Sequence, residues 1–408
     1  MAKQRLRGAT AGTRALALAV WCALATLQIA AAQREIYSFS GPAQNSAFPH
    51  GTLIRDAAGA LYGTTFGQPL VTIPPGSTGA GAVYKLTPPT QPGGAWTYTV
   101  LHAFNYPAGL FSGVIQDSNG TLYGVTYRGG QFGKGAVFSL KPPNWSLQVL
   151  HSFSGTDGAN PSGPLVFDPQ GRLWGTTQYG GSQNEGTIFR LVLGSTVTFK
   201  SIYSFTSGAD GAYPHAGLTV GLIVGATPVL YGTTAGHNGL GPAQNGTVFV
   251  VADDKVNTIF TFNGHNGTGC SDGVIVDSKG ALYGTTFAGG NGASGLGTVF
   301  KLTPTQSGPW THTILHSFNG TDGANPWGTI IFGPTGELCG TTSGGTHLST
   351  YGTFFKLIPP NWTFQSVPVP KPPLKNPEGG LMYYGNGLYI GTTYFGGASG
   401  FGDVFTIH

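Results

Sequence analysis

The feature that most constrains this chain is a repeat of two short strings that always follow one another in the same order. The first string, LYGTT or a close variant, begins at Leu61, Leu122, Leu173, Leu230, Leu282, Leu338 and Leu388. The second string, of the type GTVFKL, begins at Gly81, Gly135, Gly186, Gly246, Gly297, Gly352 and Gly402. Seven pairs in register, with a period of roughly 50 residues, indicate a repeat architecture.

Each repeat unit carries four strand signals. In one unit, an apolar run at residues 274–276 ends at an Asp-x-x-Gly turn from Asp277 to Gly280, LYGTT and GTVFKL follow, and ILHSF begins at Ile314. The same turn type begins at Asp56, Asp117 and Asp168. An aspartate can accept hydrogen bonds from nearby backbone N–H groups and a glycine can adopt a positive φ, which together suit a tight hairpin. Four antiparallel strands in a unit of this length predict the blade of a β-propeller.

The composition and the period exclude other repeat folds. No segment shows the 3.6-residue period of a helical solenoid, and a parallel β-helix needs a much shorter repeat. The chain has 69 glycines but also 12% aromatic residues, which favours short strands and tight turns over glycine-rich disorder. LYGTT is apolar on both faces, as expected for a blade packed between two neighbours. Its glycine predicts a close approach of another backbone.

The two ends of the repeat region predict how the ring closes. The last unit stops at His408 after its third strand, whereas residues 35–39, EIYSF, look like a fourth strand without a unit of its own. Pairing this segment with the last unit would complete its blade and cover an open sheet edge. We therefore expect an all-β, seven-bladed propeller in which residues 33–408 form one domain and the N-terminal strand closes the ring.

Residues 1–32 have the three regions of a secretory signal peptide. Positive charges at Lys3, Arg5, Arg7 and Arg14 precede an apolar run at residues 15–30, and an Ala-Ala-Ala sequence precedes Gln33. The alternative is an uncleaved membrane anchor, but the run is short for a spanning helix. We expect cleavage, no membrane span after it, and a secreted location that is periplasmic or extracellular.

The charge balance argues against a nucleic-acid partner. Four of the nineteen basic residues lie in residues 1–32, which leaves fifteen basic residues to match the fifteen acidic ones. A nucleic-acid-binding domain is expected to keep a basic stripe, and none is visible.

Cys270 and Cys339 occupy unlike positions in neighbouring repeats, so we expect two separate thiols. We also expect a monomer.

The succession of LYGTT, a glycine-rich loop, GTVFKLTP and ILHSFNGTDGANP resembles the GloVer tandem-repeat proteins, also called choice-of-anchor tandem-repeat proteins. The resemblance extends over residues 35–408. It implies an exported bacterial protein with a propeller-like fold and no established activity.

Polar residues that recur at one repeat position are interpreted as structural. One fourth-strand position holds His102, His151 and His316, and in other repeats Tyr37, Tyr203 and Phe260, which indicates packing. The tryptophans that precede fourth strands indicate packing at the blade edge: Trp96, Trp145, Trp310 and Trp362. The loop aspartates Asp157, Asp210 and Asp322 are interpreted as turn residues. A calcium role is the alternative, although their spacing matches no EF-hand loop.

The candidate site comes from a position at which the repeat aligns but the residue changes. It is the middle residue of a Pro-x-Gly pattern at the start of each first strand, and it holds His50, Phe111, Ser162, His215, Ser271, Trp327 and Glu378. First strands of a propeller line the central channel, so these seven residues, the ring residues, are expected to surround one mouth of it. Aromatic and polar side chains around a concave mouth suit a small polar ligand such as a sugar. Neutral drift at exposed strand starts is the alternative.

His50, His215 and Glu378 also raise the question of a metal, because histidine and glutamate are common zinc ligands. The first and last blades are neighbours, but the fourth lies across the ring, so we expect no metal and no cofactor.

No catalytic motif accompanies the repeats. The sequence contains no nucleophile elbow, no phosphate loop and no zinc-binding helix motif. We therefore expect an exported, non-catalytic binding propeller whose partner is a glycan, another cell-envelope component or a cell-surface protein. One alternative is an extracellular carbohydrate-active hydrolase or lyase with its site at the channel mouth. Another is a structural surface repeat protein.

Overall fold

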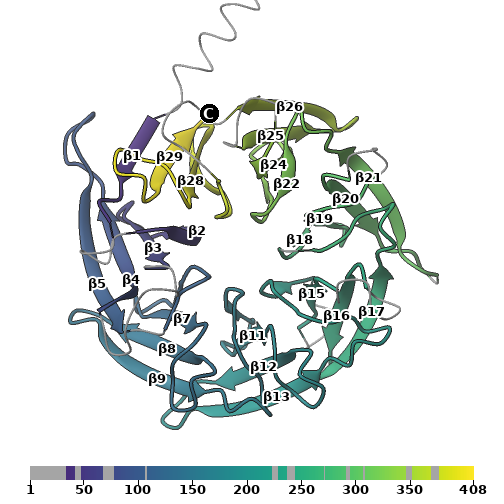
Figure 1. Cartoon of the computed structure of the whole chain (residues 1–408), viewed down its shortest axis with the longest axis horizontal. Coiled ribbons are helices and arrows are strands. Elements are labelled where there is room, and N and C mark those ends of the chain that lie inside the picture. Colours follow the sequence, from purple (N-terminus) through teal and green to yellow (C-terminus); the bar gives the residue numbers. More distant parts are fainter. Residues whose placement is uncertain are drawn as a thin grey trace, which may run out of the picture.

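The structure, a computed structural model, is a ring of seven β-sheets (Figure 1). It describes residues 34–41, 47–67, 78–105, 108–222, 228–236, 244–270, 272–290, 295–306, 308–345, 352–368 and 376–408. The predicted signal peptide, residues 1–32, lies outside these ranges, as does Ser271. Each sheet is antiparallel and forms one blade, which confirms the seven-bladed β-propeller. In the described part of the chain, no helix has the length and apolar character needed to cross a membrane.

The strands follow the order expected from the repeat, from the centre of the ring outwards. The first strands are β2 (Pro49–Arg55), β6 (Ile115–Gln116), β10 (Val166–Phe167), β14 (Thr219–Val220), β18 (Ile275–Val276), β22 (Ala324–Pro326) with β23 (Ile331–Phe332), and β27 (Met382–Gly385). The second strands are β3 (Leu61–Thr65), β7 (Leu122–Thr126), β11 (Leu173–Thr177), β15 (Leu230–Thr234), β19 (Leu282–Thr286), β24 (Leu338–Gly344) and β28 (Leu388–Thr393). All seven second strands coincide with the LYGTT strings.

The outer strands complete the blades. The third strands are β4 (Thr78–Thr87), β8 (Ala136–Lys141), β12 (Thr187–Val192), β16 (Thr247–Ala252), β20 (Thr298–Thr303), β25 (Thr353–Ile358) and β29 (Asp403–Ile407). The fourth strands are β5 (Thr97–Asn105), β9 (Ser146–Ser152), β13 (Thr198–Ser204), β17 (Lys255–Thr261), β21 (Thr311–Ser317), β26 (Thr363–Pro368) and β1 (Arg34–Ser38). Blades are numbered here from blade 1, β2–β5, to blade 7, which combines β27–β29 with β1.

The ring closes through β1, as predicted. β1 pairs antiparallel with β29, with Arg34 opposite Thr406 and Ser38 opposite Asp403. Thr406 Oγ1 donates to Arg34 O at 3.0 Å. The next residue, Phe39, is fully buried among residues of blades 1 and 7. The two ends of the described chain therefore share one blade, and β1 covers the edge that β29 would otherwise leave open.

Aromatic side chains join neighbouring blades. A tryptophan at the start of a fourth strand packs against the second-strand tyrosine of the preceding blade, as expected for blade-edge packing. The ring centroids lie 5.5–6.2 Å apart in three such pairs: Trp145–Tyr62, Trp310–Tyr231 and Trp362–Tyr283. Because the contact recurs around the ring, it gives each blade a similar orientation to the next.

The glycine of LYGTT makes room for an aromatic ring. A Cβ atom added at Gly284 would lie closer than 3.0 Å to the Phe300 side chain, and the third-strand aromatic residue of the same blade closes over this glycine in every blade. The prediction of a close backbone approach at this position is therefore wrong. The glycine instead allows a buried phenylalanine or tyrosine to lie flat on the second strand.

The Asp-x-x-Gly turns have the predicted geometry. In blade 1, Asp56 Oδ1 accepts hydrogen bonds from the backbone N–H groups of Ala58 and Ala60, both at 2.9 Å. Asp56 Oδ2 accepts a third from the Tyr62 hydroxyl at 3.0 Å. The turn carboxylate thus binds both its own loop and the second strand, which fixes the hairpin after the first strand in the blades that carry this turn.

Candidate functional site at the central channel

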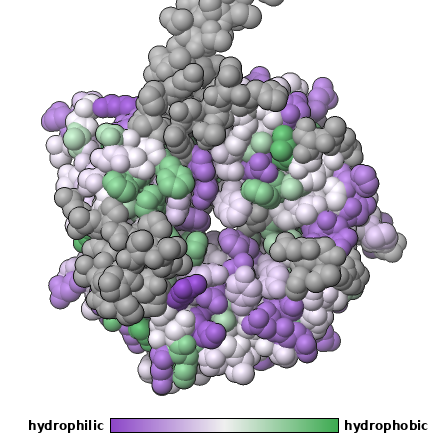
Figure 2. All heavy atoms as spheres, in the orientation of Figure 1, coloured by the Kyte–Doolittle hydropathy of each residue, from purple (hydrophilic) through white to green (hydrophobic). Residues whose placement is uncertain are grey.

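Ring residues from six blades line one small cavity at the centre of the propeller, hereafter the central cavity. They are His50, Phe111, Ser162, His215, Trp327 and Glu378. The cavity has a volume of about 50 Å³. Figure 2, drawn along the ring axis, shows a hollow where the blades converge. The structure therefore brings together every described member of the predicted ring.

The cavity is narrow because glycine backbones of neighbouring blades touch beside it. Gly51 has a φ of +79°, and a Cβ atom there would fall against the backbone nitrogen of Gly113 in blade 2. A Cβ atom at Gly163 would fall against Gly217 of blade 4 in the same way. Glycine allows this close approach because it has no side chain. The first strands therefore converge, and the few side chains at this level determine the chemistry.

The first threonine of LYGTT positions the ring residues. Thr64 Oγ1 lies 2.7 Å from the carbonyl oxygen of His50, within blade 1, and 2.9 Å from that of Ser112, in blade 2, so the two acceptors share its single proton. The equivalent hydroxyl of blade 3 bonds to the next blade, because Thr176 Oγ1 donates to the carbonyl oxygen of Ala216 in blade 4 at 2.7 Å. These hydroxyls satisfy buried carbonyls next to the cavity in the blades that make the contact, so the repeat contributes to holding the site in place.

Aromatic rings form part of the wall. His50 lies edge-on to Phe111, with ring centroids 5.6 Å apart, and His215 lies edge-on to Trp327 at 6.0 Å. Trp327 is held in turn by an edge-to-face contact with Phe287 at 5.2 Å. Such contacts restrict the orientation of the rings. The site thus combines rigid apolar surface with polar atoms.

The electrostatics of the cavity are dominated by burial. His50 Nε2 lies 3.7 Å from Glu378 Oε2. Burial lowers the pKa of His50 to about 4, and the electrostatic interaction with the nearby His215 adds to this shift. Burial raises the pKa of Glu378 to about 7. An ion pair would move both pKa values in the opposite directions. His50 is therefore neutral at pH 7, and the distance does not represent a salt bridge.

A second carboxyl group, that of Asp272, lines the same cavity and was missed by the sequence analysis. Burial raises its pKa to about 7. Asp272 Oδ1 accepts a hydrogen bond from Thr329 Oγ1 at 3.2 Å. Asp272 Oδ2 is buried and has no hydrogen-bond partner in the described part of the chain.

The signal for Asp272 was available one position after the ring residues. The aligned residues in the other six blades are small: Gly51, Ser112, Gly163, Ala216, Gly328 and Gly379. An aspartate at a position otherwise reserved for close backbone packing is a departure that the sequence could have revealed.

The central cavity offers hydrogen-bond acceptors and no lysine or arginine among its lining residues. Across the described ranges, no three His, Cys, Asp or Glu side chains lie close enough to hold a metal ion. Cys270 and Cys339 are free and buried, in agreement with the expected separate thiols. The cavity therefore suits a ligand group that donates hydrogen bonds.

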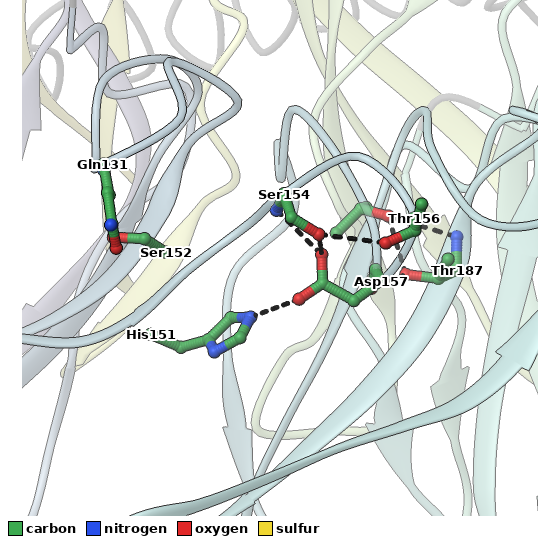
Figure 3. A network of polar contacts seen from close by, with 8 residues as sticks. Gln131, His151, Ser152, Ser154, Thr156, Asp157 and Thr187 are labelled. Atoms are coloured by element: carbon green, nitrogen blue, oxygen red, sulfur yellow. Dashed lines mark hydrogen bonds and ion pairs between the residues drawn. The ribbon is translucent and has the colours of Figure 1, made fainter.

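The recurring fourth-strand histidines pack as predicted, and two of them, His151 and His316, also pair with a loop aspartate, which the sequence analysis missed. Figure 3 shows the pair of His151 with Asp157. His151 stacks on Phe199 of the next blade, with ring centroids 3.6 Å apart, and its Nε2 lies 2.9 Å from Asp157 Oδ2. Asp157 Oδ1 accepts from the backbone N–H of Ser154 at 2.8 Å. The loop aspartate therefore acts as a turn residue and anchors the histidine.

A larger groove, of about 640 Å³, lies where the ring closes. Its lining includes Arg34, Trp96, Tyr384 and His408. These residues belong to blades 7 and 1 at the closure itself, and the groove contains none of the ring residues. We therefore place the candidate site at the central cavity.

Comparisons with known proteins support the repeat and the fold. The model of the Gloeobacter/Verrucomicrobia repeat matches residues 23–239 and 219–408. No curated protein matches the sequence. A puromycin-hydrolyzing peptidase of Mycobacterium tuberculosis is 12% identical, with a TM-score of 0.51, over 89% of this chain and 52% of that one. A candidate 6-phosphogluconolactonase of Bacteroides uniformis is 14% identical, with a TM-score of 0.49, over 80% and 86%. At 12% identity, the likeness to the peptidase is one of fold alone.

Proposed function

This chain belongs to the Gloeobacter/Verrucomicrobia repeat family, and from that premise we propose that it is a non-catalytic propeller that binds the terminal unit of a glycan at the central cavity. The observation that carries the proposal is the gathering of the variable ring residues around one cavity. Elsewhere in the repeat, the polar residues that recur satisfy turns, neighbouring blades or backbone carbonyls. The variable positions are thus the ones left for a ligand.

The chemistry of the wall supports a sugar. Trp327 and Phe111 offer apolar surface for the C–H face of a pyranose, and Glu378 offers oxygens to its hydroxyl groups. Ligand sites of this kind combine mostly apolar walls with a few well-placed polar groups. The alternative of a purely structural protein predicts no pocket at this place.

The size of the cavity favours binding over catalysis. A volume of about 50 Å³ is far below the ~300–1,000 Å³ of sites that enclose a small-molecule ligand. Only an end group of the ligand enters, and the rest lies at the open mouth. A reaction centre held there stays in contact with water, which weakens the electrostatic stabilisation on which most catalysis depends.

A glycan-array screen of residues 33–408, which contain the complete ring, tests the proposal. We expect specific binding that is lost in Trp327→Ala and in His215→Ala. Phe132→Ala is the matched control, because that side chain is 53% exposed and lies away from the cavity. If both cavity variants still bind, the glycan binds at another place on the protein. If the wild-type chain binds no glycan on the array, the ligand is not a glycan.

A hydrolase or lyase acting on extracellular carbohydrate is the second candidate, and one observation favours it. The pKa of Glu378, raised to about 7, matches the requirement of a general acid or base at neutral pH. The reaction would appear as new reducing or unsaturated ends released from polysaccharide. Turnover abolished in Glu378→Ala or in His50→Ala would support it, and turnover that persists in both excludes this site.

Export is part of the proposal and rests on residues 1–32. Sequencing the N-terminus of the protein recovered outside the cytoplasm should give Gln33 as the first residue. A recovered chain that still begins at Met1 contradicts cleavage.

A further inference from the structure

The residues that line the central cavity include polar atoms that the described part of the protein leaves without a hydrogen-bond partner. Asp272 Oδ2 is buried without a hydrogen-bond partner among the described residues. The same holds for Ser112 Oγ, whose residue is only 3% exposed. Both residues line the cavity, from blades 5 and 2. A buried polar atom without a partner costs about 1–3 kcal/mol. His50 Nδ1 is a third such atom among the lining residues, and together the three indicate a ligand group that satisfies them.

The titratable residues around the cavity indicate the charge of the ligand group. The titratable lining residues are His50, His215, Asp272 and Glu378. The two carboxyl groups face a lining without lysine or arginine, and the lowered pKa leaves His50 neutral at pH 7. An anionic group would meet two carboxyl groups, whereas a cation would favour their ionised forms. The complement of this cavity is a small positive group that donates hydrogen bonds.

The geometry selects an ammonium group over a metal ion. Among the residues that the structure describes, no set of three His, Cys, Asp or Glu side chains is close enough to coordinate a metal. A primary ammonium needs no such set, because its three N–H groups can donate to carboxylate and hydroxyl oxygens that lie around it. A cavity holds one water-sized group in ~10–15 Å³, so about 50 Å³ is ample for an ammonium and too small for a sugar ring.

We propose that the central cavity receives a primary ammonium group that donates to Asp272 Oδ2, so that the bound glycan unit is an amino sugar with a free amine. The inference rests on the proposed glycan-binding function. The sugar ring then lies at the mouth against Trp327, and its ammonium points inwards between the blades. Asp272 is the residue that distinguishes the free amine from an acetylated one, which lacks the charge and adds bulk.

The experiment compares glucosamine trimer with N-acetylglucosamine trimer by titration calorimetry at pH 7 and low salt, on residues 33–408. We expect the wild-type chain to bind glucosamine trimer at least about tenfold more tightly, as one charge-assisted hydrogen bond warrants. Asp272→Asn should abolish that preference, whereas Trp327→Ala should weaken both trimers alike. Asp253→Asn is the matched control, since Asp253 is exposed and its positive φ of 52° is compatible with asparagine.

The outcomes separate this inference from the proposed function. A glycan bound without preference for the free amine, with equal affinity in Asp272→Asn, overturns the ammonium inference and keeps glycan binding. Binding of a lysine peptide that depends on Asp272, with no binding of either trimer, assigns the ammonium to a protein partner and overturns the amino sugar. No binding of any of these ligands overturns the ammonium inference, and the glycan array then decides the proposed function separately.

Discussion

His50 Nε2 lies 3.7 Å from Glu378 Oε2, although the two residues belong to the first and the last blade of the chain. The contact exists because β1 completes blade 7 and brings it against blade 1. Closure of the ring and assembly of the central cavity are therefore one structural event. A change that opens the ring is expected to remove the site as well.

Removal of the closing strand is the first prediction. Deleting residues 34–39 leaves β29 with an open edge and removes Phe39, which is fully buried and packs edge-on against Tyr84 at 5.3 Å. We expect a marked fall in melting temperature, measured by circular dichroism. Phe39→Ala alone should cost about 3–5 kcal/mol of unfolding free energy. Phe132→Ala, at an exposed position, serves as the control. An unchanged melting temperature of the deletion variant contradicts the closure.

The second prediction concerns the glycine of LYGTT. Gly284→Ala places a methyl group against the buried Phe300 ring and should destabilise the fold by about 1–3 kcal/mol in urea denaturation. Gly194→Ala is the matched control, because Gly194 is exposed and an added Cβ atom meets no atom closer than 3.6 Å. Equal stability of the two variants would show that Phe300 moves aside without cost.

The third prediction concerns the turn aspartate of blade 2. Asp117 accepts two backbone hydrogen bonds on Oδ1 and the Tyr123 hydroxyl on Oδ2. Asp117→Ala leaves these donors without their acceptor and should lower the unfolding free energy by about 1–3 kcal/mol. Asp117→Asn keeps the Oδ1 acceptor and should cost less. The order of the two variants in chemical denaturation is the readout, and a reversed order counts against the turn geometry.

The fourth prediction is a pH dependence of stability caused by Asp272. Its pKa is about 7 in the folded protein and close to 3.8 in the unfolded chain. Between these values the unfolded chain releases the proton while the folded protein retains it, so the contribution of Asp272 to stability falls as the pH rises from about 4 to 7. Asp272→Asn removes this pH-dependent loss of stability because asparagine does not titrate.

The measurement is the difference in melting temperature between Asp272→Asn and the wild-type chain across pH 4–8. The unfolding free energy of the variant should rise relative to that of the wild type as the pH rises, by an amount on the order of 2 kcal/mol at pH 8. His50 acts in the opposite direction, since its lowered pKa removes stability as the pH falls. Taking the difference cancels that contribution because both chains contain His50. A difference that does not vary with pH contradicts a buried, protonated Asp272.

The repeat pattern was sufficient to predict the blades because strand pairing within a blade is local. LYGTT and GTVFKL lie close in sequence, and each match defines which strand pairs with which. The orphan segment at residues 35–39 predicted the closure for the same reason, since only one strand lacked a partner. The ring residues were found as the positions at which an otherwise regular repeat changes.

The sequence by itself thus determined the seven blades, their strand order and six of the residues that line the central cavity. Only the tertiary structure decided how closely those side chains meet, because the width of the cavity depends on the packing of all seven blades and on glycine backbones in contact, such as Gly51 and Gly113. It also decided that Asp272 is desolvated and that His50 is neutral, since burial depends on neighbours contributed by distant repeats. A local pattern specifies the direction of a side chain, whereas its solvation depends on the closed ring.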